Sequence, residues 1–180
     1  LLSTQHLDQW RQKLGPTLLV VLAHSWGPVH RQNNLPAIIQ SIEALRQSQG
    51  YHSVIWLRHW QDPAEIPLPT GWIQACNGHR SNPWFLDAMR TLLQLSTGLV
   101  SNSFGTHLGY AMQMNCRLHW LDLPSTQNLD ALSMEQQQRE RIEWERRREL
   151  GQQLQQVSHD DRALRNLLLP YWGFDHVLTP

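Results

Sequence analysis

The chain has 180 residues, of which 41% are hydrophobic and 17% are charged, and its formal net charge at pH 7 is zero. This composition is typical of a folded globular domain and excludes a disordered chain. A neutral charge balance is also unlike that of a general nucleic-acid-binding protein, which carries a basic stripe, so we expect no nucleic-acid partner.

Strand and helix patterns alternate through the first two thirds of the chain. The continuous apolar run TLLVVLA at 17–23 predicts a strand buried on both faces, as in a parallel sheet. Apolar residues at helical spacing then predict a helix between Pro36, which suits a first helical turn, and Gly50, which ends it. Further strands are predicted at 53–58, 72–77, 98–101 and 117–121, and further helices at 84–95 and 106–114. This alternation predicts an α/β fold, a Rossmann-like parallel sheet of about five strands with right-handed crossovers and helices on both faces.

The pattern changes from Asn128 onward. Residues 128–169 indicate two helices and no strand. Within the stretch EQQQRERIEWERRREL, acidic and basic residues recur four apart, as in Glu135 with Arg139, which favours a solvated helix face.

An apolar stripe follows at Leu164, Leu167 and Leu168, and we expect it to dock on the sheet. The expected organisation is therefore a Rossmann-like core over residues 1–127. Residues 128–180 form a helical extension that packs on the same domain.

Two cysteines, Cys76 and Cys116, lie in apolar runs, and the chain has no C-x-x-C pair. We therefore expect buried free thiols in a reducing compartment rather than a disulfide scaffold. No apolar run reaches the length that crosses a bilayer, and no signal peptide is recognisable. The expected location is cytoplasmic, without a transmembrane segment.

Polar and cationic residues gather where the predicted strands end, and in an open parallel sheet ligands bind at those carboxyl ends. An arginine there can grip a phosphate or a carboxylate, but Arg80 is equally consistent with an exposed loop residue bonded to a helix end. The candidate phosphate-binding residues are His79, Arg80, Ser101, Asn102, Ser103, Gly105, Thr106 and His107. His24 and Ser25, after the first strand, are further residues expected to line the same site, and His59 follows the second strand.

The stretch VSNSFGTHLGYA at 100–111 ends one predicted strand and begins a helix. A helix N-terminus presents unpaired N–H groups and a partial positive charge. Gly105 lets the backbone approach a ligand closely, and the side chains of Thr106 and His107 add hydrogen-bond donors. This favours a phosphate or diphosphate site. The alternative is structural: Ser103 only caps the helix, and His107 is a surface histidine.

The chain lacks the signatures of several other enzyme classes. It has no G-x-S-x-G elbow and neither H-E-x-x-H nor H-x-x-x-H spacing, so neither a serine hydrolase nor a metal site is expected. It has no Walker A motif, and no G-x-G-x-x-G fingerprint follows the first strand, which disfavours a P-loop enzyme and a nicotinamide-dependent dehydrogenase.

The central part of the sequence carries a resemblance to a known family. The segment ACNGHRSNPWFLDAMRTLLQLSTGLVSNSFGTHLGYAMQMNCRLHWLD resembles the carboxyl-terminal half of bacterial GT-B glycosyltransferase-like proteins from surface-polysaccharide clusters. The matching residues are Gly78-His79, Asn82-Pro83, Phe85-Leu86, Ser101-Asn102, Gly105-Thr106-His107 and Tyr110. The early LLVVLAHS and the late YWGFDHVLTP, with Trp172-Gly173-Phe174, resemble the first strand and the closing segment of that half. The sequence departs from the family at Asn115-Cys116-Arg117, where a Gly-Lys-Pro-like turn is usual.

The resemblance implies a nucleotide-sugar donor bound across the strand ends, with no cofactor and no essential metal ion. An acceptor hydroxyl would attack the anomeric carbon, while a helix N-terminus and basic side chains stabilise the leaving diphosphate. It also implies a glycan acceptor and a missing N-terminal half of the same protein. The catalytic base is unassigned between His24 and a residue of that half. The implied location is cytoplasmic, including the inner face of the membrane.

Two other functions stay open from the sequence. One is a non-catalytic or degenerate Rossmann-like binding module, favoured by the length of the chain and the unassigned base. The other is an epimerase-like enzyme that acts on a nucleotide sugar and needs no acceptor.

Overall fold

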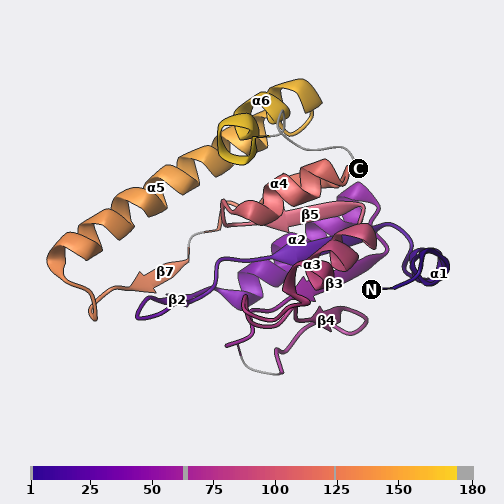
Figure 1. Cartoon of the computed structure of the whole chain (residues 1–180), viewed down its shortest axis with the longest axis horizontal. Coiled ribbons are helices and arrows are strands. Elements are labelled where there is room, and N and C mark those ends of the chain that lie inside the picture. Colours follow the sequence, from indigo (N-terminus) through magenta and orange to yellow (C-terminus); the bar gives the residue numbers. More distant parts are fainter. Residues whose placement is uncertain (1, 63–64, 124, 174–180) are drawn as a thin grey trace.

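The computed structural model of the protein describes residues 2–62, 65–123 and 125–173. At its centre lies a five-stranded parallel sheet in the order β4-β3-β1-β5-β6 (Figure 1). The strands are β1 (Thr17–Val21), β3 (Ser53–Leu57), β4 (Ile73–Ala75), β5 (Gly98–Ser101) and β6 (Arg117–Trp120). From β1 the chain builds outward in one direction through β3 and β4, and then in the other through β5 and β6. The expected Rossmann-like α/β fold is confirmed, and the strand order reverses between β1 and β5.

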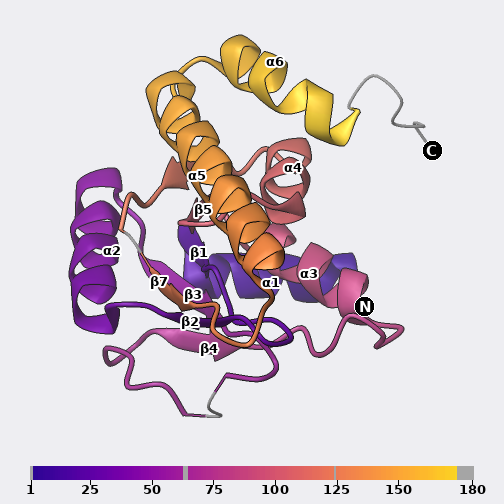
Figure 2. The same cartoon turned by 90° about the vertical axis from the view of Figure 1, so that its left-hand side faces the viewer.

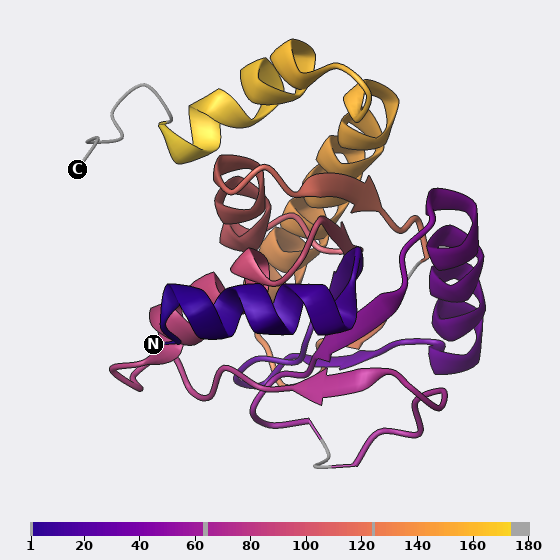
Figure 3. The ribbon, with the colours of Figure 1, turned by 90° about the vertical axis from the view of Figure 1, so that its right-hand side faces the viewer.

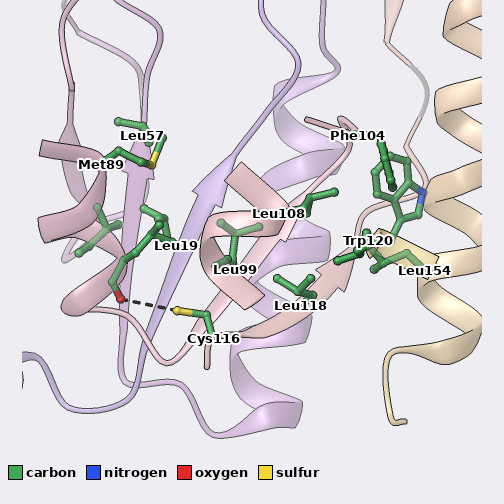
Figure 4. Packing of buried hydrophobic residues seen from close by; sticks show 14 of the residues in the cluster. Leu19, Leu57, Met89, Leu99, Phe104, Leu108, Cys116, Leu118, Trp120 and Leu154 are labelled. Atoms are coloured by element: carbon green, nitrogen blue, oxygen red, sulfur yellow. Dashed lines mark hydrogen bonds between the residues drawn. The ribbon is translucent and has the colours of Figure 1, made fainter. Parts of the chain in front are cut away.

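Helices cover both faces of this sheet. In the described part of the chain they are α1 (Thr4–Leu14), α2 (Leu35–Gln49), α3 (Phe85–Gln94), α4 (Thr106–Gln113), α5 (Met134–Val157) and α6 (Asp161–Trp172). Leu19 and Leu99 face a core shared with α3 and α4 (Figure 4), whereas Leu18 and Val20 face a second core with Ile42 of α2. Because successive side chains of a strand alternate between faces, β1 supplies both cores. Figure 3 shows α1 beside α3, and the Arg11 side chain donates to the Gln94 carbonyl there at 2.8 Å.

A second, antiparallel sheet pairs β2 (His30–Gln32) with β7 (Thr126–Asn128). This pair and the N-terminal half of α5 extend beyond one end of the main sheet (Figure 1). The strand β7 ends at Asn128, so the expectation of two helices and no strand over 128–169 fails only at its first residue, and the elements β2, β7 and α1 are absent from the prediction. Both short strands are three residues long and polar, so hydrophobic periodicity gives no signal for them. The helix α1 buries only Leu7 and Leu14.

Two glycines let the C-terminal helices approach the core closely. A Cβ on Gly151 of α5 would overlap the ring of Trp120 in β6, and a Cβ on Gly109 of α4 would lie 2.5 Å from the ring of Trp172 in α6. Leu164 and Leu168 of the predicted apolar stripe are buried in the core that contains Leu99, and Leu167 is partly buried against it. The helix α6 packs on α4 and α5. Phe174 of the family-like closing segment lies outside the described residues.

The helix α5 is long and largely exposed, as its charge pattern predicts. Glu135 pairs with Arg139 at 2.5 Å, and Glu143 lies 3.8 Å from Arg147, each with a spacing of four residues. No helix in the described ranges is both long enough and apolar enough to cross a membrane.

The two cysteines differ in environment. Cys116 is buried, and its thiol lies 3.6 Å from the Leu93 carbonyl and 3.4 Å from the Ser96 carbonyl (Figure 4). Burial raises the pKa of this thiol to about 11, which keeps it protonated. The expectation that Cys76 is also buried is wrong: it is exposed, because the short edge strand β4 ends at Ala75.

Candidate functional site

A cleft of about 750 Å³ opens at the carboxyl ends of the parallel strands. Its lining comes from the ends of β1 and β3, the loop after β4, the first turns of α3 and α4, and from β2 and α5. The cleft therefore lies where the strand order reverses, the usual ligand site of an open α/β sheet. Figure 2 looks toward this end of the molecule, with α5 in front of the strands. The volume lies in the range of pockets that hold small molecules and cofactors.

Basic side chains gather in this lining. The arginines and histidines there are Arg31, Arg58, Arg80, Arg147, His24, His59, His79 and His107. Among the described residues that line the cleft there is no Asp and no Glu. The whole chain carries 15 acidic and 15 Lys or Arg residues, so the lining is a local concentration of basic groups. It favours an anionic ligand.

Most of the predicted site residues line this cleft. They are His24, His79, Arg80, Ser103, Gly105, Thr106 and His107. Ser25, Ser101 and Asn102 are not part of the lining, and each of the three holds neighbouring backbone in place.

His107 is tied to the end of β5. Its Nε2 lies 2.9 Å from the Oγ of Ser101, which also accepts the Ser103 N–H and donates to the Ser103 carbonyl, both at 3.0 Å. Because the hydroxyl proton is used on that carbonyl, we assign the ring proton to Nε2, which donates to Oγ. Burial lowers the pKa of His107 to about 4, the Ser103 backbone raises it and the charge of His24 lowers it. The ring is therefore neutral at pH 7.

The N-terminus of α4 opens into the cleft without a side-chain cap. Its N-cap is Gly105, and no side chain accepts its first N–H groups within the described residues. The His107 ring packs against this glycine, since a Cβ there would lie 3.0 Å from Nδ1 and Cε1. Neither part of the structural alternative holds, because Ser103 is not the cap and His107 is partly buried and bonded to Ser101. The N–H groups and the positive end of the helix dipole face the basic lining.

A row of rings crosses the cleft. The ring of His24 stacks on that of His59, with centroids 3.8 Å apart and planes 4° apart. Trp60 contacts both His59 and His79, at centroid distances of 5.7 and 4.8 Å. Burial lowers the pKa of His59, the charges of His24 and His79 lower it too, and Asp62 raises it. Two stacked imidazolium rings would repel each other, so this arrangement disfavours protonation of His59.

The loop after β4 presents Arg80 to the cleft. Gly78 has a φ of +78°, a conformation that favours glycine, and a Cβ there would lie 3.1 Å from the Asn82 amide nitrogen. The His79 Nδ1 lies 2.6 Å from the Ser81 hydroxyl. Arg80 has no hydrogen-bond or ion-pair partner within the described residues. Its guanidinium is therefore available to a ligand.

Asn102 links the ends of β1 and β5, the two strands between which the strand order reverses. Its Oδ1 accepts the Ala23 N–H at 2.8 Å, and its Nδ2 lies 3.3 Å from the Asn33 side-chain oxygen. Asn33 in turn donates to the Ala23 carbonyl at 3.1 Å. This buried network fixes the end of β1 against the end of β5, so Asn102 positions the floor of the cleft.

Three arginines of the lining are absent from the sequence prediction. Arg31 lies on β2, which has no sequence signal, and Arg147 lies on a helix face predicted to be only solvated. Arg58 donates to the carbonyls of His59 and Asp62 at 3.3 and 3.1 Å. It follows a strand directly, so the strand-end rule that selected His24 could have found Arg58 but not the other two.

In the described ranges, no group of three or more His, Cys, Asp or Glu side chains is placed to hold a metal ion. No family model, no curated protein and no solved structure matches the chain.

Proposed function

We propose that this chain binds a nucleotide-sugar donor in the cleft, as the donor-binding domain of a metal-independent glycosyltransferase. One observation carries the proposal: Arg and His side chains, with no Asp or Glu among the described lining residues, surround the uncapped N-terminus of α4. A diphosphate suits such a lining, because its oxygens accept helix N–H groups and arginine forks. The resemblance from Ala75 to Asp122 adds the sugar and the transfer reaction.

In this proposal the diphosphate lies at the start of α4. The N–H groups after Gly105, the Thr106 hydroxyl and the Arg80 guanidinium would bind its oxygens. His107 has its Nε2–H engaged by Ser101 and is neutral, so it shapes the loop and supplies no charge. The leaving group would thus be stabilised by dipoles and an arginine that are already in place.

Exposed aromatic rings offer flat surfaces for the nucleoside and the sugar. Trp26, Trp60 and Tyr110 line the cleft and are 42%, 42% and 44% exposed. A base or a sugar ring stacks favourably on such faces. In the proposed complex, these rings would contact the uncharged base and sugar of the donor.

His24 is the candidate general base on this chain. Its Nδ1 lies 2.8 Å from the Ser25 carbonyl, so Nδ1 carries the proton and Nε2 is left as an acceptor. An acceptor hydroxyl that transfers its proton there could attack the anomeric carbon as the bond to the diphosphate breaks. The alternative base lies on a second domain, which would also hold the glycan acceptor.

Thermal shift and calorimetry with UDP, GDP, CMP, ADP and their sugar conjugates test the binding step, because a ligand of the native state raises Tm. We expect one nucleotide to bind saturably, and Arg80→Gln to weaken it roughly tenfold to a hundredfold. Arg139→Gln is the matched control, since Arg139 is 75% exposed on α5 and lies outside the cleft. Equal affinity in wild type and Arg80→Gln would contradict the proposed site.

The same lining favours a second candidate function. With no carboxylate among the described lining residues, the chain offers only histidines as a base, which suits a binding module without transfer activity. Product analysis separates the possibilities. A transferase releases the nucleoside diphosphate when an acceptor is present, an epimerase releases an isomerised nucleotide sugar, and a binding module returns the donor unchanged.

A further inference from the structure

Arg31 and Arg147 lie on a part of the cleft wall that would not hold the diphosphate. Arg31 belongs to β2 and Arg147 to α5, and both side chains line the cleft. The loop after β4 and the start of α4 already supply donors for a diphosphate. The basic groups on β2 and α5 are therefore available to bind a different group of the ligand.

The Arg31 guanidinium is held in place by its neighbours, but one of its hydrogen-bond donors has no acceptor within the described residues. Its carbon lies 4.4 Å from the ring centroid of Trp144, and its Nη1 donates to the His24 carbonyl at 3.4 Å. Its Nε is buried and has no partner within the described residues. A buried donor without an acceptor is unfavourable, so the guanidinium of this lining residue is incompletely paired.

Arg147 adds a second positive charge to the same cleft lining. Burial lowers the pKa of Arg31, Glu140 raises it, and the charge of Arg147 lowers it further. Arg147 forms a loose ion pair with Glu143, at 3.8 Å, on an exposed helix face. Glu140 offsets part of the repulsion between the charges of Arg31 and Arg147, and an anion bound between the two guanidinium groups would offset more of it.

We propose that Arg31 and Arg147 form a second anion subsite, which takes an acidic group on the sugar of the donor. The shared chemistry is an oxyanion, either the carboxylate of a uronic acid or the phosphate of a sugar phosphate, since arginine binds both through paired N–H groups. The inference rests on the proposed function for the identity of the donor. The subsite itself rests on the two arginines and the unsatisfied Nε.

The indole N–H of Trp144 is a local reporter, because its ring stacks on Arg31. Its NMR signal is assigned by its loss in Trp144→Phe. The probes are D-glucuronate, D-glucose 6-phosphate and neutral D-glucose. We expect a saturable shift of this signal with one or both acidic sugars and none with glucose. Arg147→Gln should weaken that binding roughly tenfold, whereas Arg139→Gln on the same helix should leave it unchanged.

Each outcome bears on the subsite. A response to glucuronate alone identifies a carboxylate, and a response to glucose 6-phosphate alone identifies a phosphate. No response to either acid, an equal response to glucose, or a response that persists in Arg147→Gln overturns the inference. Arg147→Gln alters an exposed position on a helix, so its fold is retained and its result is interpretable.

A pyrophosphate titration of the same samples separates this inference from the proposed function. The indole signal of Trp60, which contacts His79, reports the diphosphate end of the cleft. A pyrophosphate response without an acidic-sugar response retains the proposed function and overturns the subsite. An acidic-sugar response without a pyrophosphate response retains the subsite and overturns the diphosphate site.

Discussion

The stacked rings of His24 and His59 give the cleft a charge that depends on its occupant. In the free protein the pKa of His59 is lowered, first by burial and then by the neighbouring histidine charges. An anion beside the pair favours the protonated ring and raises that pKa. Binding of an anion is therefore coupled to uptake of a proton.

This coupling predicts that anion affinity rises as pH falls. Sulfate is a suitable probe, because its charge does not change between about pH 8 and about pH 6 while histidine titrates. We expect tighter sulfate binding at the lower pH, measured by calorimetry, and a flatter pH profile in His59→Asn. An unchanged slope in that variant would place the proton uptake elsewhere.

At the scale of single elements, the packing of α5 on the sheet depends on the absence of a Cβ at Gly151. Gly151 lies against the buried ring of Trp120, and a Cβ at that position would overlap the ring. Replacing a glycine inside a helix by alanine ordinarily stabilises a protein by about 1 kcal/mol. Overpacking a core destabilises it by about 1–3 kcal/mol, and a buried indole cannot swing away. The gain in helix propensity and the cost of overpacking have opposite signs, and the cost of overpacking against Trp120 is the larger of the two.

We therefore expect Gly151→Ala to lower the free energy of unfolding by about 1 kcal/mol or more, measured by urea denaturation. The double variant Gly151→Ala with Trp120→Leu should show a smaller effect of the alanine than the single variant does. Additive effects in this double-mutant cycle would mean that the two residues do not interact.

The elements that sequence could reveal are those that bury apolar side chains. Continuous runs predicted the five parallel strands, and helical spacing predicted α2, α3 and α4. The strand-end rule then found the loops that carry Arg80 and His107. The strands β2 and β7 bury little and read as HRQ and TQN, so Arg31 could not be placed in the cleft before its backbone was known. The part of the cleft that carries Arg31 forms by pairing of β2 with β7, two strands far apart in the chain, and no local sequence pattern predicts that pairing.

At the scale of the whole molecule, two histidines among the described residues have strongly lowered pKa values. Burial lowers the pKa of both His107 and His119 to about 4, and the Nε2 of His119 lies 2.8 Å from the Tyr51 hydroxyl. Their pKa in the unfolded chain is about 6.5. Between these values the unfolded state binds more protons than the folded state. Stability is therefore complete above the unfolded pKa and is lost as pH falls through this window.

We expect the free energy of unfolding to fall by about 1.4 kcal/mol per pH unit for each of these histidines between about pH 6.5 and about pH 4. Urea denaturation at a series of pH values measures this slope. His119→Gln should keep a partner for Tyr51 and remove one histidine's share of the slope. A slope identical to that of the wild type would assign the acid sensitivity to other groups.

The β2–β7 pair joins two segments that lie far apart in the chain, which affects when the cleft can form during folding. His30 pairs with Asn128, and four of the five strands of the main sheet lie between them in the chain. Pairing over so long a separation is slow, because the intervening loop must close first. During synthesis, the segments of the central sheet emerge before residue 128 does. The β2–β7 pair that carries Arg31 thus forms after the segments of the central sheet have emerged, and a chain can hold a formed sheet while its cleft is still open on one side.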